Sequence, residues 1–182
     1  MILIGLRYKV AHFLLRSKAA KVKRQKTLYD FASAKHIGLL CAPKNEADSV
    51  LLKDFLNRLS QKEIKYSVLG YIDKEEIPEN LLYWKNIDFI TQKDLNLFFI
   101  PDKNLVVKKF IDEPFDMVIN CNLSNYFPLE YASQLSVAKC KVGIKRDGDS
   151  GYDLMIDISK ERTVEYFLKN LEIYLSNLRN PK

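Results

Sequence analysis

Short apolar runs alternate with segments of helical spacing along most of this chain. The runs predict strands at residues 36–42, 65–71, 87–91, 115–121, 140–144 and 154–158. Unbroken runs of this length are typical of strands that helices cover on both faces of a sheet. Strands that alternate with helices are joined by parallel crossovers. We therefore expect an α/β fold, namely a three-layer αβα, Rossmann-like domain with a mostly parallel sheet of five or six strands in the order 3-2-1-4-5-6.

An aromatic residue followed by an aspartate opens two of these runs, as Phe115-Asp116 and as Tyr152-Asp153. In a parallel sheet both aspartates precede their strands, so we expect them at the edge opposite to the usual ligand site. There they cap turns or meet Lys and Arg side chains. This position argues against a pair of catalytic carboxylates.

Helical spacing predicts helices after the first strand and at residues 105–111, 128–137 and 163–178. Asn45 or Asp48 is suited to cap the first of them. The inner faces that we expect for the first and the last of these helices are formed by Val50, Leu51, Phe55, Leu56 and Leu59, and by Val164, Phe167, Leu168, Leu171, Tyr174 and Leu175.

The N-terminal segment has a different character. Residues 2–26 predict an amphipathic helix with one face formed by Leu3, Leu6, Val10, Phe13, Ser17 and Ala20. The same segment carries the basic residues Arg7, Lys9, Arg16, Lys18, Lys21, Lys23, Arg24 and Lys26, and no acid precedes Asp30. The whole chain has a net charge of +6, so the remainder is slightly acidic. We therefore divide the chain into a basic helical arm, residues 1–30, and a single Rossmann-like domain, residues 31–182.

Three interpretations of the basic arm stay open. It packs on its own domain with a solvated basic face, it lies on an anionic membrane surface, or it contacts nucleic acid through phosphates. No apolar run approaches the length of about 20 residues that a membrane span requires. The start lacks a basic region before its apolar residues, so we expect no secretion signal. We expect a cytoplasmic location, which is peripheral to the inner membrane if the arm binds lipid.

Two loops of the predicted sheet are candidates for a ligand crevice, because ligands bind at the carboxyl ends of parallel strands where the strand order reverses. One loop follows the first strand and the other follows the fourth strand. The amide and hydroxyl side chains that these loops offer to a small polar ligand are Asn45, Asn120, Asn122, Ser124 and Asn125. The same residue types also cap helices and shape turns, which is the alternative interpretation.

Several common chemistries are disfavoured by the sequence. The loop at residues 42–46 contains no glycine, whereas dinucleotide sites need glycines there, and no Walker pattern is present. Cys41, Cys121 and Cys140 lie in or beside apolar runs, which indicates buried reduced thiols. The two histidines, His12 and His36, lie away from the expected crevice. We therefore expect no metal site and no cofactor, and we identify no catalytic residue.

The chain resembles an uncharacterised family of bacterial proteins of about this length over nearly its whole length. The motifs that carry this resemblance are Gly70-Tyr71-Ile72-Asp73, residues 91–96, residues 115–119, Phe127-Pro128-Leu129 and residues 152–157. That family has no known activity, so the resemblance implies family membership but no chemical function.

Residues 115–144 are also similar to the N-terminal Rossmann half of heptosyltransferase-like GT-B glycosyltransferases. There an aromatic-Asp strand leads through a helix to a basic segment with a glycine, here Lys141-Val142-Gly143. The resemblance implies a glycosyltransferase-like half domain. This chain departs from the pattern in having Pro43-Lys44 where those enzymes have a Gly-Asp motif, and it has no room for their second domain.

The sequence leads us to one main hypothesis and two alternatives. The main hypothesis is a non-catalytic binding or accessory module whose basic arm contacts a membrane or a nucleic acid. The first alternative is a small glycosyltransferase-like or sugar- or metabolite-binding protein that uses the crevice after the first and fourth strands. The second alternative is a homo-oligomer formed through the apolar stretch Phe98-Phe99-Ile100.

Overall fold

The computed structural model describes residues 2–82, 84, 87–146 and 151–178. Its centre is one six-stranded sheet in the order β3-β2-β1-β4-β5-β6, and every neighbouring pair is parallel. The strands are β1 (His36–Cys41), β2 (Lys65–Tyr71), β3 (Ile87–Ile90), β4 (Met117–Asn120), β5 (Cys140–Ile144) and β6 (Leu154–Ile156). The predicted α/β class, Rossmann-like strand order and preceding N-terminal helix are therefore confirmed.

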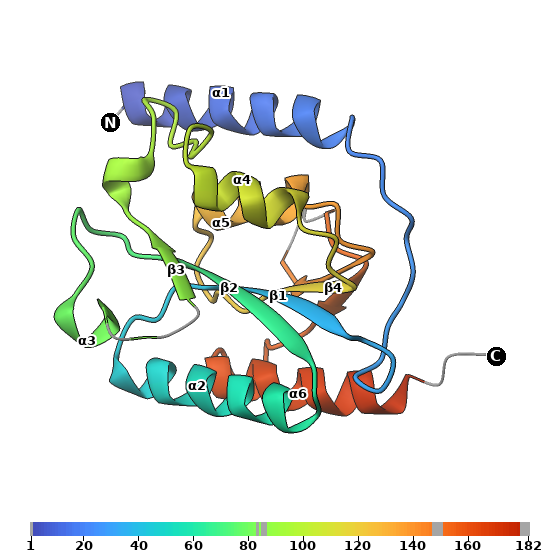
Figure 1. The fold of residues 1–182 in the computed structure, drawn as a ribbon. Helices are drawn as coiled ribbons and strands as arrows, with labels where there is room; N and C mark the ends of the chain where they lie inside the picture. The colour runs from blue at the N-terminus through green and yellow to red at the C-terminus, as the bar shows by residue number, and fades with distance from the viewer. Residues whose placement is uncertain (1, 83, 85–86, 147–150, 179–182) are drawn as a thin grey trace.

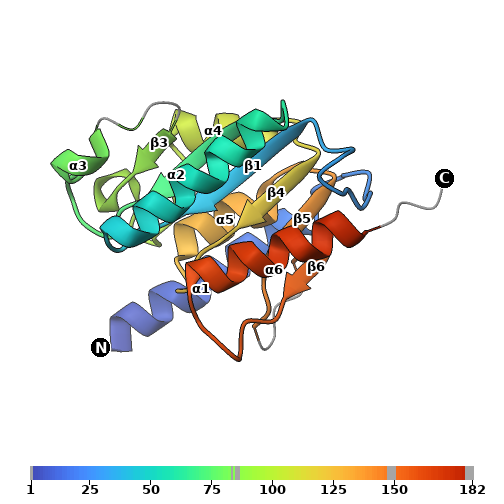
Figure 2. The ribbon, with the colours of Figure 1, turned by 90° about the horizontal axis from the view of Figure 1, so that it is seen from below.

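Helices cover both faces of this sheet (Figure 1). They are α1 (Ile2–Ala19), α2 (Glu46–Gln61), α3 (Glu79–Leu82), α4 (Leu105–Asp112), α5 (Phe127–Leu135) and α6 (Val164–Asn177), with a 3₁₀ turn η1 (Gln92–Asp94). In Figure 1, α2 and α6 lie on one face, α4 and α5 lie on the other, and α1 lies outside α4 and α5. Seen from below in Figure 2, α2 and α6 run side by side across the strands. The N-terminal helix thus adds a fourth, outer layer to the three expected layers.

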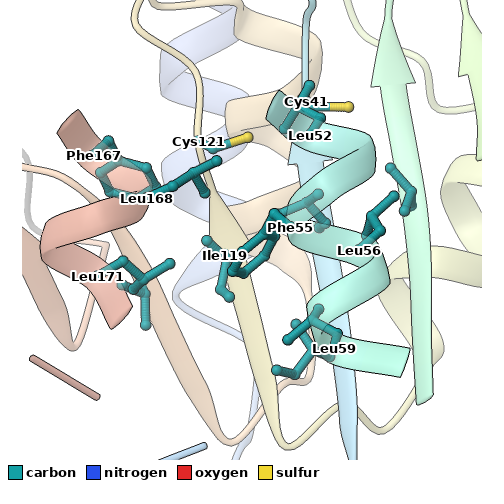
Figure 3. Packing of buried hydrophobic residues seen from close by; sticks show 14 of the residues in the cluster. Cys41, Leu52, Phe55, Leu56, Leu59, Ile119, Cys121, Phe167, Leu168 and Leu171 are labelled. Atoms are coloured by element: carbon teal, nitrogen blue, oxygen red, sulfur yellow. The ribbon is translucent and has the colours of Figure 1, made fainter. Parts of the chain in front are cut away.

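Two apolar cores lie on the two faces of the sheet. The larger joins α2 and α6 to the strands through Phe55, Ile119 and Phe167, all of them fully buried (Figure 3). The second joins α4 and α5 to the other face and includes Ala11 and Leu15 of α1. Burying one large apolar side chain stabilises the fold by about 1.5–3 kcal/mol. The side of α1 that carries Ala11 and Leu15 is therefore part of the folded core.

Local capping explains where α2 and α6 begin. The Asn45 side-chain oxygen accepts a hydrogen bond of 2.8 Å from the backbone N–H of Asp48, so Asn45 is the N-cap of α2. The Thr163 hydroxyl accepts a bond of 3.1 Å from the backbone N–H of Tyr166 at the start of α6. Each cap satisfies one of the backbone donors that a helix leaves unpaired in its first turn.

The N-terminal helix is shorter than predicted, since it ends at Ala19 and not near residue 26. Residues 22–30 have no regular secondary structure and pass along the start of β5. The backbone N–H of Thr27 donates to the carbonyl of Lys139 at 3.1 Å, and the Arg24 guanidinium donates to the same carbonyl at 3.1 Å. These tertiary bonds replace the helical bonds that Lys- and Arg-rich sequence would otherwise favour. We call residues 20–30 the strap.

Two helix faces also differ from the prediction. Val50 is 59% exposed and Leu52 is buried in its place, and Tyr174 of α6 is 54% exposed. Both residues lie at the margin of the apolar face of their helix. Because each residue turns the helix by about 100°, the side chain next to a buried one at this margin can be exposed to solvent. The short helix α3 has too few residues to produce a helical pattern in the sequence.

Candidate functional site

The amino edge of the sheet uses its acidic residues for structure, as the sequence predicted. One Asp116 carboxylate oxygen accepts from the backbone N–H groups of Lys35 and His36 at 2.9 and 3.1 Å, and the other accepts from the Lys139 amine at 3.0 Å. These bonds hold the beginnings of β1, β4 and β5 together. The bonds and the charge of Lys139 keep the pKa of Asp116 below its usual value, although burial acts to raise that pKa.

Asp153 at the start of β6 has a similar role. Its two carboxylate oxygens accept from the two Nη atoms of Arg24 at 2.6 and 2.7 Å, and the Oδ2 oxygen also accepts from the backbone N–H of Lys141 at 2.9 Å. The Arg24 side chain is only 9% exposed in this bidentate pair. Although burial acts to raise the pKa of Asp153, bonds to Arg24 and Lys141 keep it below its usual value. Arg24 therefore anchors the strap to the sheet.

The cysteines are packing residues in this structure. Cys41 ends β1, Cys121 directly follows the adjacent strand β4, and both are buried among apolar side chains (Figure 3). Burial raises the pKa of Cys41 to about 12, and burial together with the neighbouring Cys41 raises that of Cys121. Cys140 is buried as well, and its pKa is raised to about 11. Such thiols are protonated at neutral pH and are poor nucleophiles.

The crevice predicted between the loops after β1 and β4 is closed. The Lys44 amine of the first loop donates to the Ser124 hydroxyl of the second at 2.7 Å. Asn120 and Asn122 are both 4% exposed, and the Asn120 amide donates to the Tyr152 hydroxyl at 2.7 Å. The structure therefore joins the side chains of Asn120 and Asn122 inside the β4 loop, whereas Ser124 bonds to the β1 loop.

Open space lies one strand further along the same edge. A cavity of about 350 Å³ separates the loop after β1 from the loop after β2, and a second of about 490 Å³ lies between the loop after β2 and the N-terminal half of α1. Tyr71, Asp73 and Tyr126 line both cavities. We call the two cavities together the carboxyl-edge cleft. Asn45 lines the first lobe and Asn125 lines the second, so these two predicted residues face open space.

Tyr71, Asp73 and Tyr126 form the shared wall of the cleft. Asp73 Oδ1 accepts from the Tyr71 hydroxyl at 3.1 Å and from the Gln92 amide at 2.9 Å. The rings of Tyr71 and Tyr126 have their centroids 5.3 Å apart. Burial, followed by the negative charge of Asp73, raises the pKa of both phenols, so both hydroxyls keep their protons at neutral pH.

The sequence analysis missed this trio as a site, although a signal was present. Tyr71 ends a predicted strand and Asp73 follows it, so the same rule that drew attention to the β1 and β4 loops also places these residues at the carboxyl edge. The missing information was the packing of the loops, because the β1 and β4 loops bond to each other while the β1 and β2 loops stay apart.

The second candidate surface is the outer side of α1. The packed side contains the buried Ala11 and Leu15, and near the N-terminus the Tyr8 ring stacks on Phe99 with centroids 4.4 Å apart. The stripe noted in the sequence faces away from the domain, with Leu3 76%, Leu6 58% and Phe13 71% exposed. We call these three residues the α1 stripe. They belong to α1, which forms the outermost layer of the molecule (Figure 1).

The eight basic residues of the arm divide into two groups. The first group is bonded to the domain. Arg7 donates to the Leu97 carbonyl, and Lys18 donates to the Tyr131 hydroxyl. Arg24 binds Asp153, and the Lys26 amine lies 3.6 Å from the same carboxylate. The exposed members whose side chains form no ion pair or hydrogen bond with other described residues are Lys9, Arg16, Lys21 and Lys23. The apolar stretch at residues 98–100 lies partly beneath α1. There Ile100 is buried, and the Phe99 ring stacks on the Tyr8 ring.

Two further findings concern the described part of the chain as a whole. None of its helices has the length and apolar character needed to cross a membrane. Among the described residues, no group of three or more His, Cys, Asp or Glu side chains is arranged to hold a metal ion.

Comparison with known proteins gives one family and one distant structural likeness. The model of the family described as "Family of unknown function (DUF6913)" matches residues 7–178, in agreement with the resemblance read from the sequence. No curated protein matches the chain. The solved structure titled "E. coli heptosyltransferase WaaC with ADP" is similar with a TM-score of 0.46 and 10% identity over 80% of this chain. The chain spans 48% of that enzyme's length.

Proposed function

The chain belongs to this family of unknown function, and from the outer side of α1 we propose that it is a binding module that lies on anionic membrane surfaces. The single observation that carries the proposal is the α1 stripe, in which Leu3, Leu6 and Phe13 stay exposed on a helix whose opposite side is packed. Exposed apolar residues in a row mark interaction surfaces in folded proteins. Here the domain presents the stripe on a rigid support.

The charge around the stripe supports an anionic membrane as the occupant of this surface. Each residue turns a helix by about 100°, which places Lys9 and Arg16 beside Phe13 on the outer side of α1. The strap adds Lys21 and Lys23, and the sequence has no acid before Asp30. An apolar stripe bordered by Lys and Arg matches a bilayer with anionic headgroups, where the stripe enters the interface and the cations stay among the lipid phosphates.

The two other occupants of such a surface fit it less well. Proteins bind nucleic acid through contacts to phosphates and through aromatic rings that stack on bases. Two of the three residues in the α1 stripe are leucines, which cannot stack in this way, so the stripe suits nucleic acid poorly. A second copy of the chain that packed through the same stripe would bring Lys9 and Arg16 close to their own counterparts, and like charges repel each other. Both occupants are outcomes of the experiment below.

The test is sedimentation of the full chain with vesicles of phosphatidylcholine alone and of phosphatidylcholine with 30% phosphatidylglycerol. We expect binding to the anionic vesicles that weakens in 0.5 M NaCl. The variant Leu6→Ser/Phe13→Ser should lose at least tenfold in affinity, because each buried apolar side chain contributes about 1.5–3 kcal/mol. The matched control is Val50→Ser/Ile173→Ser, which removes two exposed apolar residues from α2 and α6 on the opposite face and should bind like the natural protein.

Charge is tested in the same assay. Lys9→Glu/Arg16→Glu should abolish binding, whereas Lys160→Glu/Lys169→Glu has the same net charge and should retain most of it. Equal losses in the two charge variants would show a nonspecific attraction and would count against the α1 surface. Binding to a single-stranded RNA without binding to vesicles, or a concentration-dependent dimer that Phe13→Ser dissolves, would overturn the proposal in favour of another occupant.

The first alternative from the sequence, a sugar- or metabolite-binding protein, is favoured by a separate observation. The carboxyl-edge cleft provides the open space that the predicted β1–β4 crevice lacks. This observation is argued from its own residues below.

A further inference from the structure

The carboxyl-edge cleft has the position and the size of a small-molecule site. Parallel α/β sheets bind ligands beyond the carboxyl ends of their strands, and the lobes of about 350 and 490 Å³ lie beyond β1 and β2. Sites for small molecules commonly have volumes of about 300–1,000 Å³. Five different segments of the chain contribute to the lining, including Arg7 and Tyr8 of α1 in the second lobe.

Asp73 is the polar centre of the cleft. Two hydrogen bonds, from Tyr71 at 3.1 Å and Gln92 at 2.9 Å, fix the position of its Oδ1 atom. No Lys, Arg or His among the described residues forms an ion pair with it. The carboxylate is thus oriented by neutral donors, and it retains the capacity to accept further hydrogen bonds because an ionised carboxylate has about four acceptor positions.

The two tyrosine rings beside Asp73 supply apolar surface. Tyr71 is 5% exposed, so its ring is fixed by packing, and the Tyr126 ring lies against it at an angle of 57°. A rigid aromatic surface next to fixed polar groups suits a ligand that has C–H groups on one side and hydroxyls around its rim.

The charge of the lining is nearly balanced, which disfavours strongly ionic ligands. The acids Glu46 and Asp73 are set against the bases Arg7, Lys44 and Lys74. Lys44 already donates to Ser124, and the Arg7 guanidinium lies 4.5 Å from the centre of the Phe99 ring. Glycines that would let the backbone cradle a phosphate are missing from residues 42–46. The remaining groups are mainly amides and hydroxyls, which bind neutral hydroxyls as donors and as acceptors.

From this arrangement we infer that the carboxyl-edge cleft binds a neutral, hydroxyl-rich small molecule, such as a monosaccharide or a cyclitol, with Asp73 as the acceptor for adjacent hydroxyls and with Tyr71 and Tyr126 against its C–H face. This inference does not depend on membrane binding, because the cleft is formed by the domain itself and the experiment contains no lipid.

The experiment is saturation-transfer NMR on the full chain with three sets of probes. The neutral set is methyl glucoside, methyl mannoside, methyl galactoside and myo-inositol, the anionic set is glucose 6-phosphate and AMP, and the cationic set is choline and spermidine. We expect signals from at least one neutral probe, with the strongest transfer at its C–H protons on one face. Asp73→Asn should weaken binding of that probe at least tenfold, because Oδ1 stays bonded to Tyr71 and Gln92 while the other carboxylate oxygen, which is left to accept from the ligand, is replaced by an NH₂ donor.

The matched control is Asp88→Asn, which changes an exposed carboxylate in β3 that does not line the cleft. It should bind the probe like the natural protein. A second variant, Tyr126→Leu, keeps apolar volume at the wall and should reduce transfer from the C–H face. Binding of anionic or cationic probes alone, binding that Asp73→Asn leaves unchanged, or a complete lack of signals from the neutral set would overturn the inference.

Discussion

Asp116 and Asp153 at the amino edge of the sheet have partners of a different kind from those of Asp73 at the carboxyl edge. At the amino edge, Asp116 and Asp153 each bind backbone N–H groups and a cation, Lys139 or Arg24. At the carboxyl edge, Asp73 is held by the neutral donors Tyr71 and Gln92, and none of the described cations pairs with it. A carboxylate that binds both backbone N–H groups and a cation stabilises the fold. A carboxylate that is oriented by neutral donors alone can still accept hydrogen bonds from a ligand.

The direction of the strands explains this difference. At the amino edge, strands begin and their first N–H groups need acceptors, so a carboxylate that binds the N–H groups of Lys35 and His36 replaces a missing strand neighbour. At the carboxyl edge, the chain leaves the sheet into loops whose distance from one another is set by side chains. The loops after β1 and β4 are joined by Lys44 and Ser124, and those after β1 and β2 are not.

The largest effect that we predict concerns the pair that fastens the strap. Arg24→Ala leaves the Asp153 carboxylate, which is 12% exposed, without its bidentate partner. Removing one member of a mostly buried pair destabilises a protein by about 3 kcal/mol or more. Urea unfolding followed by circular dichroism should show this loss in the free energy of unfolding.

The control for Arg24 is an exposed ion pair. Glu76→Gln breaks the pair of Glu76 with Lys93, whose side chains are 87% and 55% exposed, and should change stability by less than about 0.5 kcal/mol. Arg24→Lys should recover only part of the loss, because an ammonium group cannot donate to both carboxylate oxygens in a fork. Equal effects of Arg24→Ala and Glu76→Gln would contradict the structural role assigned to the strap.

A buried amine at the same edge predicts a pH dependence. Lys141 is 3% exposed and donates to the Gln134 carbonyl at 2.8 Å. Burial, and then repulsion from Arg24, lowers its pKa from 10.5 to about 7. Between these two values the unfolded chain binds a proton that the folded chain does not, so stability rises with pH from about 7 upward. Relative to Lys141→Met, the natural protein should gain about 1.5 kcal/mol between pH 7 and 8.5.

Urea unfolding at a series of pH values measures this gain. The readout is the difference in slope between the two proteins, because Lys141→Met also changes packing and thereby shifts the absolute stability. Parallel pH profiles for the two proteins would show that Lys141 keeps its charge in the fold, and the assignment of a lowered pKa would then be wrong.

Asp116→Asn should have a smaller effect at neutral pH. The amide keeps the shape of the side chain but weakens the bonds from Lys35 and His36 and removes the attraction to Lys139, so we expect a loss of about 1 kcal/mol. A lowered carboxyl pKa contributes stability that is present above the unfolded value of 3.8 and is lost as the pH falls through the folded value. The variant should therefore be less sensitive to acid below about pH 4, as unfolding measured from pH 7 to pH 3 would show.

Most of the fold could be predicted from the sequence, because strand and helix patterns are local. The ranges predicted for β2 and β5 agree with the structure. The unbroken apolar runs, alternating with helices, were sufficient to predict a parallel sheet and its strand order. The end of α1 at Ala19 could not be predicted in this way. Residues 21–26 favour a helix locally, but the bonds from Arg24 and Thr27 to Lys139 join positions more than a hundred residues apart.

The candidate site was harder to predict than the fold for the same reason. Asn45 and Asn125 line the carboxyl-edge cleft, but the amide of Asn120 donates to Tyr152 and the amide of Asn122 donates to Asn120. Whether an amide faces a ligand or its own loop depends on neighbours that no sequence pattern records. The α1 stripe was visible in the sequence as a face, but only the packing of Ala11 and Leu15 shows that this face points outward.

The smallest effect that we predict sharpens the comparison of the two edges. Asp73→Asn should change the free energy of unfolding by less than about 0.5 kcal/mol, because Asp73 is exposed, pairs with no described cation, and can still accept from Tyr71 and Gln92 as an amide. Urea unfolding of Asp73→Asn beside Asp116→Asn compares the same chemical change at opposite edges. If Asp73→Asn were as destabilising as Asp116→Asn, both acids would be structural, and the capacity of Asp73 to bind a ligand would lose its physical basis.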